Sequence, residues 1–420
     1  MAGPSGGVRH GPDPTALVWL LNAAVLAVLV VAPLAILVQA SLSEPRGFGI
    51  GNFLTAFGRT IYRGPIVNSF FYAAAVAVLS VVIGAPLAWL VARTDLPGKG
   101  IVRTLTIAAF VTPSFLGATA WVILAGPNAG LINVLYRSLT GAEGPLVNIF
   151  SMSGLIFVTS LYTFPVVFIL TGAALTATPP DLEEAARIAG ASRWHVVRDV
   201  TLPLAAPAIL GGFILAFLET VVLFGAPAML ALPARFHVMT TQLWAFFHYP
   251  PKVEVAAAYA MPLLLAAAGL LWVQRRLLGR RTFTTVGGRG APPRPIALGP
   301  WRGVALAGVV VVLTCSILLP YLALLRAALA KAWGLGWTWD NFTLRNFRYV
   351  MFEYDPTRSA IVNTLVLGVV TATLASVLMA GIAYAAHRRL LPGARALAFL
   401  ATAPLAVPGI VLSIGLFRAY

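Results

Sequence analysis

The chain has 420 residues, of which 59% are hydrophobic and only 10% are charged, and its mean hydropathy is +0.89. A soluble core cannot absorb that much apolar side chain, so the composition excludes an ordinary soluble protein and predicts a membrane protein. The formal net charge of +16 could suggest nucleic-acid binding, but its distribution along the chain indicates membrane topology instead.

Apolar runs that can cross a hydrocarbon core of about 30 Å as helices of roughly 20 residues recur along the chain. Unpaired backbone groups are not tolerated in lipid, so the runs predict an all-α, polytopic membrane helical bundle. The first run is too long for a secretory signal peptide and lacks its small-residue cleavage site. The predicted spans are 16–40, 66–92, 104–125, 152–176, 205–231, 255–278, 303–329, 361–386 and 396–417.

Pro113 lies inside the third predicted span. Proline removes a backbone donor and clashes with the preceding turn, so we expect it to kink this helix. Such a kink can line a solute pathway or can serve packing alone, and both interpretations stay open.

A polar segment at 178–203 separates the fourth and fifth spans and holds the densest acidic cluster of the chain. Thr178 or Asp181 can cap a first helix, and acidic residues suit the positive end of its dipole. Gly190 is expected to end that helix. Four residues at helical spacing predict one shallow apolar face: Leu182, Ala185, Ala186 and Ala189.

The same segment predicts a second short helix. Ser192 can cap it, and Pro203 is expected to end it after Val200, before the next span. We therefore expect a helix-turn-helix that lies across the membrane rather than through it. An ordinary amphipathic hairpin in a loop between spans would show the same pattern.

Glu219 lies in the fifth predicted span. An ionisable side chain at such depth costs at least ~2.5 kcal/mol unless it is paired or hydrated. It can face the pathway or its gate, or it can bond Thr220 or another span and fix helix packing.

The distribution of Lys and Arg predicts a cytoplasmic N-terminus. The segments 1–15, 93–103, 176–205, 275–302 and 387–395 contain 17 of these residues. The segments predicted on the opposite side contain 10. They are 41–65, 126–153, 232–254 and 331–360.

An internal repeat aligns 66–125 with 361–420 at a constant offset of 295 residues, with fifteen identities in sixty positions. The matches include Arg93 with Arg388 and Pro113 with Pro408. Six spans precede the second copy, so the two copies would enter the membrane in the same orientation. The predicted divisions are a cytoplasmic tail at 1–15, a first membrane unit at 16–278, a linker at 279–302 and a second unit at 303–420.

The second predicted unit is shorter than the first. A counterpart of 178–203 should begin near position 473, whereas Tyr420 is the last residue. We expect three spans to be missing from this copy, either because the sequence is a fragment or because the second half is degenerate.

Catalytic and cofactor sites are not indicated. Cys315 is the single cysteine and lies in a predicted span, and the five histidines are scattered over different loops. No phosphate-binding Gly-Lys-Ser/Thr motif and no nucleophile-base set is present in the sequence. We therefore expect no catalytic residue, metal or cofactor.

The residues of 184–203 resemble the EAA loop of ABC importer permeases. The pattern is Glu-Ala-Ala, three residues, Gly, nine residues, Val, one residue, Leu-Pro, with valine where the family usually has isoleucine. The resemblance implies that this loop docks on a separate cytoplasmic ATPase dimer. It assigns coupling to Glu184, Ala185, Ala186, Gly190, Val200, Leu202 and Pro203.

The chain as a whole resembles the fused two-unit permeases of the iron(III) importer group, including the stretches 131–133 and 242–258. This resemblance implies a multi-pass permease of the cell inner membrane, which receives solute from an extracytoplasmic binding protein and works by alternating access. The solute would be iron(III) or another small solute, such as aminoethylphosphonate, thiamine or a polyamine. The alternatives are a secondary transporter driven by an ion gradient, which Glu219 alone would support, and a truncated membrane protein that does not transport.

Overall fold

The computed structural model describes residues 14–178, 181–278, 295–332, 338–388, 401 and 409–419. The chain forms two compact units, one of 55–251 with 265–344 and one of 1–54 with 252–264 and 345–420. Two helices cross the boundaries between these ranges, α3 (Gly51–Gly58) and α14 (Val253–Leu278).

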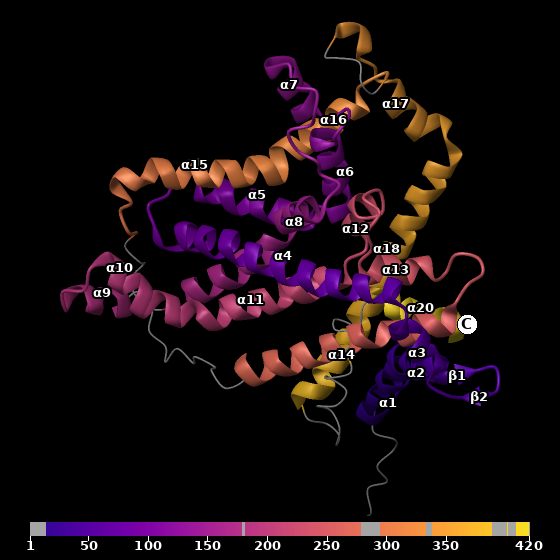
Figure 1. The fold of residues 1–420 in the computed structure, drawn as a ribbon. Helices are drawn as coiled ribbons and strands as arrows, with labels where there is room; N and C mark the ends of the chain where they lie inside the picture. Colours follow the sequence, from indigo (N-terminus) through magenta and orange to yellow (C-terminus); the bar gives the residue numbers. More distant parts are fainter. Residues whose placement is uncertain are drawn as a thin grey trace, which may run out of the picture. The chain divides into compact units, whose positions relative to one another are not determined.

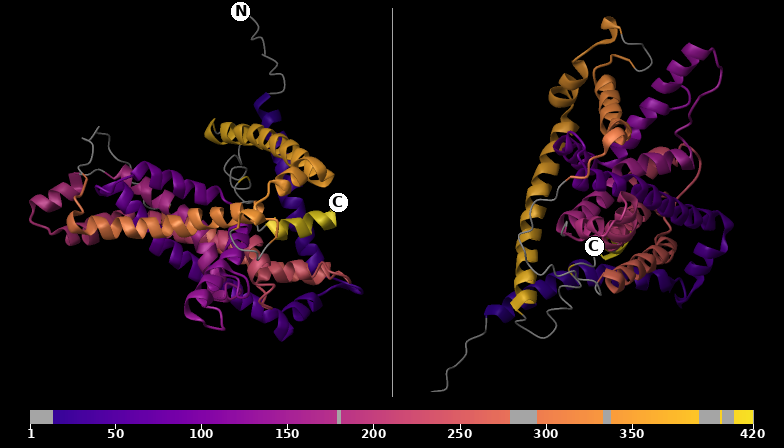
Figure 2. Two further views of the ribbon diagram at one scale, coloured as in Figure 1. Left: turned by 90° about the horizontal axis from the view of Figure 1, so that it is seen from above. Right: turned by 90° about the vertical axis from the view of Figure 1, so that its left-hand side faces the viewer.

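The larger unit is built on three helices that pack side by side (Figure 1, Figure 2). They are α4 (Thr60–Arg93), α8 (Met152–Ala177) and α11 (Leu202–Val222). Glycines allow their backbones to approach closely, as is common between membrane helices. A Cβ added at Gly84 of α4 would lie 2.6 Å from the carbonyl oxygen of Phe164, and one at Gly212 of α11 would lie 3.0 Å from Cα of Val167.

Shorter elements complete the larger unit. The first group is α5 (Lys99–Val111), α6 (Ser114–Ala125), α7 (Leu131–Thr140), α9 (Asp181–Ile188), α10 (Arg193–Val196), the π-helix η2 (Val197–Thr201), α12 (Gly225–Leu230) and α13 (Met239–Ala245). The second is η3 (Gly299–Trp301), α15 (Arg302–Leu313), η4 (Thr314–Leu318), α16 (Leu319–Ala328) and η5 (Trp339–Asn341). The first span of the predicted second permease unit therefore packs with helices of the first, α15 on α5 and α16 on α6.

The predicted kink at Pro113 is a full break. Helices α5 and α6 are bent by 99° where they meet. Pro113 itself lies outside both helices, and its carbonyl oxygen accepts hydrogen bonds from the amides of Leu116 and Gly117 at the start of α6. Proline suits the start of a helix because amides there have no carbonyl partner within the helix, so its missing N–H costs no hydrogen bond.

The smaller unit contains α1 (Pro14–Leu26), η1 (Ala27–Val31), α2 (Ala32–Leu42), α17 (Arg345–Arg348), η6 (Tyr349–Glu353), α18 (Asp355–Arg388) and α20 (Gly409–Ala419). Within it α1 packs on α18, and α2 packs on α20. Helices α4 and α18 both have 34 residues, and their bounds differ by the 295 residues of the repeat.

The prediction of an all-α membrane protein is confirmed. Within the described residues the strands are limited to an antiparallel hairpin, β1 (Ser43–Glu44) and β2 (Gly47–Phe48). In the same residues, seven helices are long and apolar enough to cross a membrane, or eight if the bent pair is one span. Most of the predicted ninth span, including Pro408, lies outside the described residues, as does nearly all of the predicted tail 1–15.

Candidate functional site

The polar segment 178–203 folds at one end of α8 and α11, where α9 is its first helix (Figure 1). Helix α9 ends as predicted. Gly190 has a φ of +88°, its amide donates to the Arg187 carbonyl at 3.0 Å, and the Ala191 amide donates to the Ala186 carbonyl at 3.0 Å. These two bonds form a Schellman motif, for which a residue without Cβ is favoured because its φ is positive.

The second helix of the segment begins at Ser192, also as predicted. The Ser192 hydroxyl accepts a hydrogen bond from the His195 amide at 3.4 Å and lies 2.7 Å from His195 Nδ1. Side-chain capping of this kind satisfies an amide that the helix cannot.

The prediction that Pro203 ends this second helix is wrong. The helix continues from Trp194 to Val222, so its first turns are the beginning of the fifth span. The π-turn η2 comes directly before α11, and the Leu202 amide donates a hydrogen bond to the Val197 carbonyl. Proline is tolerated there because it lies in the first turn of α11, after a shift in the hydrogen-bond ladder.

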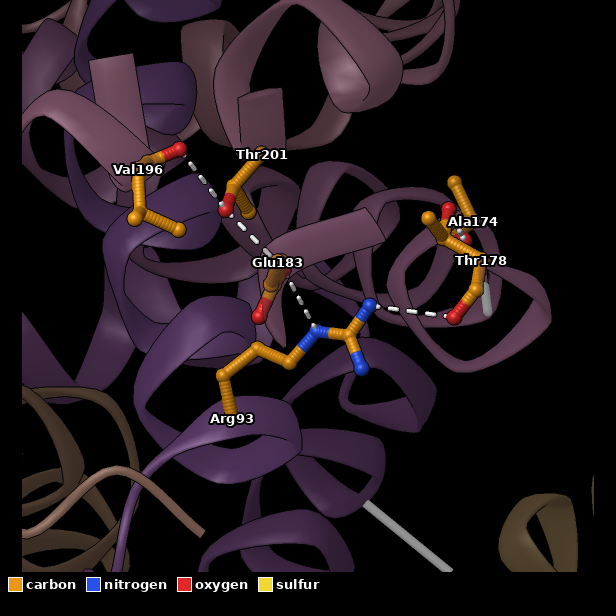
Figure 3. A network of polar contacts seen from close by, with 6 residues as sticks. All are labelled: Arg93, Ala174, Thr178, Glu183, Val196 and Thr201. Carbon is orange, nitrogen blue, oxygen red and sulfur yellow. Dashed lines mark hydrogen bonds and ion pairs between the residues drawn. The ribbon is translucent and has the colours of Figure 1, made fainter. Parts of the chain in front are cut away.

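A buried polar network holds the segment to the end of α4 (Figure 3). Arg93, the last residue of α4, is 4% exposed, and its Nε lies 3.3 Å from Oε1 of Glu183, which is 8% exposed. The Thr201 hydroxyl donates to the same carboxylate oxygen at 2.9 Å, and Arg93 Nη2 donates to the Thr178 carbonyl at 3.1 Å. Buried charges are tolerated when they are paired and hydrogen-bonded, as both are in this network.

The network fixes which side of α9 faces outward. Glu183 faces the body of the unit, and Ala186 is half-buried. Leu182 is 49% exposed and Ile188 is 88% exposed, and Glu184, Ala185 and Ala189 are also exposed. The exposed side of α9 therefore combines apolar side chains with the charged Glu184 and Arg187.

The other predicted site residues are dispersed. Val200 is half-buried, whereas Leu202 and Pro203 are exposed at the start of α11. Glu219 is exposed near the opposite end of α11. The Thr220 hydroxyl donates to the Ala216 carbonyl at 2.7 Å, so a bond from Glu219 to Thr220, one of the alternatives considered for Glu219, does not form.

Sequence reasoning missed Arg93 as part of this site and treated it only as a marker of the repeat. An arginine at the last residue of a predicted span was the available signal. Its partner could not be chosen from the sequence, because Asp181, Glu183 and Glu184 lie together in the first turns of α9.

Residues 80–325, more than half of the chain, match a family model described as binding-protein-dependent transport system inner membrane component. A relative from Haemophilus influenzae, named as a ferric transport system permease protein, is 24% identical over 363 residues. That alignment covers 84% of this chain and 56% of the relative, so this chain spans about half the length of that protein. A relative from Haloferax volcanii, named as a molybdenum ABC transporter permease protein, is 28% identical over 60% of this chain and 84% of its own length.

A solved structure shares the fold. It is the crystal structure of a bacterial ABC transporter involved in the import of the acidic polysaccharide alginate. One of its chains matches with a TM-score of 0.52 at 20% identity, over 64% of this chain and 98% of its own length.

Proposed function

The chain belongs to the family of binding-protein-dependent transport system inner membrane components, and from this premise we propose that it forms part of the solute pathway of an ATP-driven importer and is coupled to a separate ATPase through residues 178–203. The family makes the chain a multi-pass inner membrane permease component and not an enzyme. In the proposed mechanism a solute-binding protein delivers the solute on the outer side, and an ATPase dimer drives alternating access.

One observation carries the proposal: α9 is anchored through the buried Glu183 and exposes apolar side chains, among them Ile188, on its other side. Glu183 is held by Arg93 and Thr201, while Ala185 and Ile188 point away from the unit. A capped helix with exposed apolar side chains at a polar loop is suited to docking into a hydrophobic cleft of a partner protein. Coupling is thus proposed for the motif residues Glu184, Ala185, Ala186 and Gly190, with Val200, Leu202 and Pro203 joining them to the span.

The experiment compares Ile188→Asp with Leu139→Asp. Leu139 is 76% exposed on α7, outside 178–203, and is a matched control for the change in surface charge. We expect Ile188→Asp to weaken binding of the purified ATPase subunit of the same transport system at least tenfold, and Leu139→Asp to leave it unchanged. Equal binding by both variants would contradict docking on α9.

Topology is part of the proposal. The segments 93–95, 178–201 and 295–298 are joined by ion pairs and hydrogen bonds within the larger unit. All three belong to the segments rich in Lys and Arg, which supports their placement on the cytoplasmic side together with the N-terminus. We also propose the two-unit organisation at 16–278 and 303–420, which the equal lengths of α4 and α18 support.

The proposed solute is iron(III), or another small solute handled by such permeases. The relatives named above are a ferric permease and a molybdenum permease. Uptake of radiolabelled iron(III) and molybdate by cells that express the complete transporter separates the two. An ionophore that collapses ion gradients should leave uptake intact while ATP depletion abolishes it, and the reverse result would favour a secondary transporter.

A further inference from the structure

Arg93, the last residue of α4, and the two residues after it form a turn, Arg93 to Asp95, that is bonded in two directions at once. The Arg93 side chain reaches the polar segment through Glu183 and the Thr178 carbonyl. The backbone of the same turn pairs with residues that precede α15: the Ile296 amide donates to the Arg93 carbonyl at 2.8 Å, and the Asp95 amide donates to the Ile296 carbonyl at 3.1 Å.

Asp95 adds a side-chain bond to this pairing. Its Oδ1 accepts a hydrogen bond from the Leu298 amide at 2.9 Å. Leu298 is the N-cap of η3, which leads directly into α15. The entry to α15 is therefore fixed to the end of α4 by three hydrogen bonds, and a carboxylate acceptor makes one of them strong.

The space between the polar segment and α15 is a cavity of about 410 Å³. It is lined by Glu183, Arg187 and Trp194 on one side and by Ile296, Trp301 and Val304 on the other. The turn at 93–95 is bonded to both of these surfaces.

We propose that the turn Arg93–Asp95 is a junction that passes a displacement of α9 to α15, with Arg93 and Asp95 as positioning residues. The junction rests on the proposed function, since the displacement would come from an ATPase docked on α9. Arg93 suits this role because its planar side chain bonds two partners in the segment while its own backbone is paired with Ile296. Arg93 is buried and tied to the polar segment, and three hydrogen bonds tie Arg93 and Asp95 to the residues before α15. Such bonds pass a displacement on, whereas a flexible surface contact would not.

The test uses spin-label distances in the full chain, reconstituted with its ATPase in lipid, in a Cys315→Ser background. One label pair, at Ala189→Cys and Val82→Cys, reports α9 against α4. A second pair, at Val304→Cys and Val82→Cys, reports α15 against α4. With the original turn, we expect ATP to shift the distance in both pairs.

Asp95→Ala and Ile296→Pro each remove one bond of the junction on the α15 side. In both variants we expect the first pair to shift and the second pair to lose its shift, whereas Asp95→Asn, which keeps an oxygen acceptor, should retain both shifts. The exposed pair Arg348–Glu353, reversed as Arg348→Glu with Glu353→Arg, is the control and should retain both.

The outcomes separate the two proposals. Full shifts of the second pair in Asp95→Ala and Ile296→Pro would overturn the junction and leave the proposed function standing. Absence of any shift in the first pair with the original turn, although ATPase is bound, would overturn the junction as well. Failure of the ATPase to bind α9 would overturn the proposed function and the junction together.

Discussion

Arg93 Nε, at the end of α4, lies 3.3 Å from Oε1 of Glu183 on α9, and both side chains are buried. This pair joins the proposed coupling helix to a helix of the central bundle rather than to its own neighbours in sequence. Because Thr201 donates to the same carboxylate, the pair also holds α9 to the π-turn η2 inside the helix of the fifth span.

Breaking the pair from one side should destabilise the protein. Arg93→Met leaves Glu183 buried without its cation, and a broken buried pair typically costs about 3–5 kcal/mol. Thermal unfolding in detergent should therefore show a clear loss for Arg93→Met and for Glu183→Leu. The double variant should recover part of that loss, because no charge then remains unpaired.

The exposed pair Arg348–Glu353 is the control for this measurement. Its nitrogen–oxygen distance of 3.0 Å is shorter than that of the Arg93–Glu183 pair, yet both of its side chains are exposed. Exposed pairs contribute about 0–1 kcal/mol, so Arg348→Met should change the unfolding midpoint little. A loss in Arg348→Met as large as that in Arg93→Met would contradict the importance given to burial.

Gly190 should tolerate asparagine better than valine. A residue with Cβ at a left-handed φ costs roughly 1–2 kcal/mol, and asparagine adopts this conformation more readily than a β-branched residue. A Cβ at Gly190 would meet no atom within 4 Å, so the effect is one of backbone conformation alone. We expect Gly190→Val to insert normally but to uncouple ATP hydrolysis from uptake, and Gly190→Asn to transport. Equal uptake per ATP in both variants would show that the stop of α9 is not needed for coupling.

Parts of this site follow from local sequence, and other parts do not. The Gly190 stop and the Ser192 cap were predictable because each depends on residues within one turn. The continuation of the helix through Pro203 was not, since it depends on a π-turn that nothing in the sequence marks. The partners of Arg93 and Ile296 are set by tertiary packing, which composition and periodicity do not encode.

The fold shows the same division. Most long apolar runs became helices near their predicted bounds, because lipid allows the backbone few alternatives. The break at Pro113 was expected only as a kink, because the sequence does not show that α6 packs on α12 and α16 after a bend of 99°. The prediction divided the chain into two consecutive units, and such a division does not show that α15 packs with helices of the first unit.

Close packing between α4 and α8 should make Gly84 sensitive to a single methyl group. The Cβ of Gly84→Ala would lie 2.6 Å from the Phe164 carbonyl oxygen and 3.0 Å from the Phe168 amide nitrogen, both backbone atoms that cannot move away by rotation. We expect a loss of about 1–3 kcal/mol, seen as a lower unfolding midpoint. Gly172→Ala is the matched control on α8, because its Cβ would meet only Ala88 Cβ at 4.0 Å. Comparable midpoints in the two variants would mean that the α4–α8 contact can relax.

Glu219→Gln should lower solute uptake while the protein remains folded. Glu219 lies exposed on α11, three residues before the helix ends at Val222, and the Thr220 hydroxyl is directed to Ala216 instead. An acid at membrane depth is costly unless water or another polar group meets it, so we expect Glu219 to face a hydrated pathway. Uptake per folded molecule, in cells that express the complete transporter, measures the effect.

The control is Glu143→Gln, a change at an exposed loop residue, which should transport normally. Unchanged uptake by Glu219→Gln would remove this residue from the mechanism, and loss of folded protein would restore the packing interpretation.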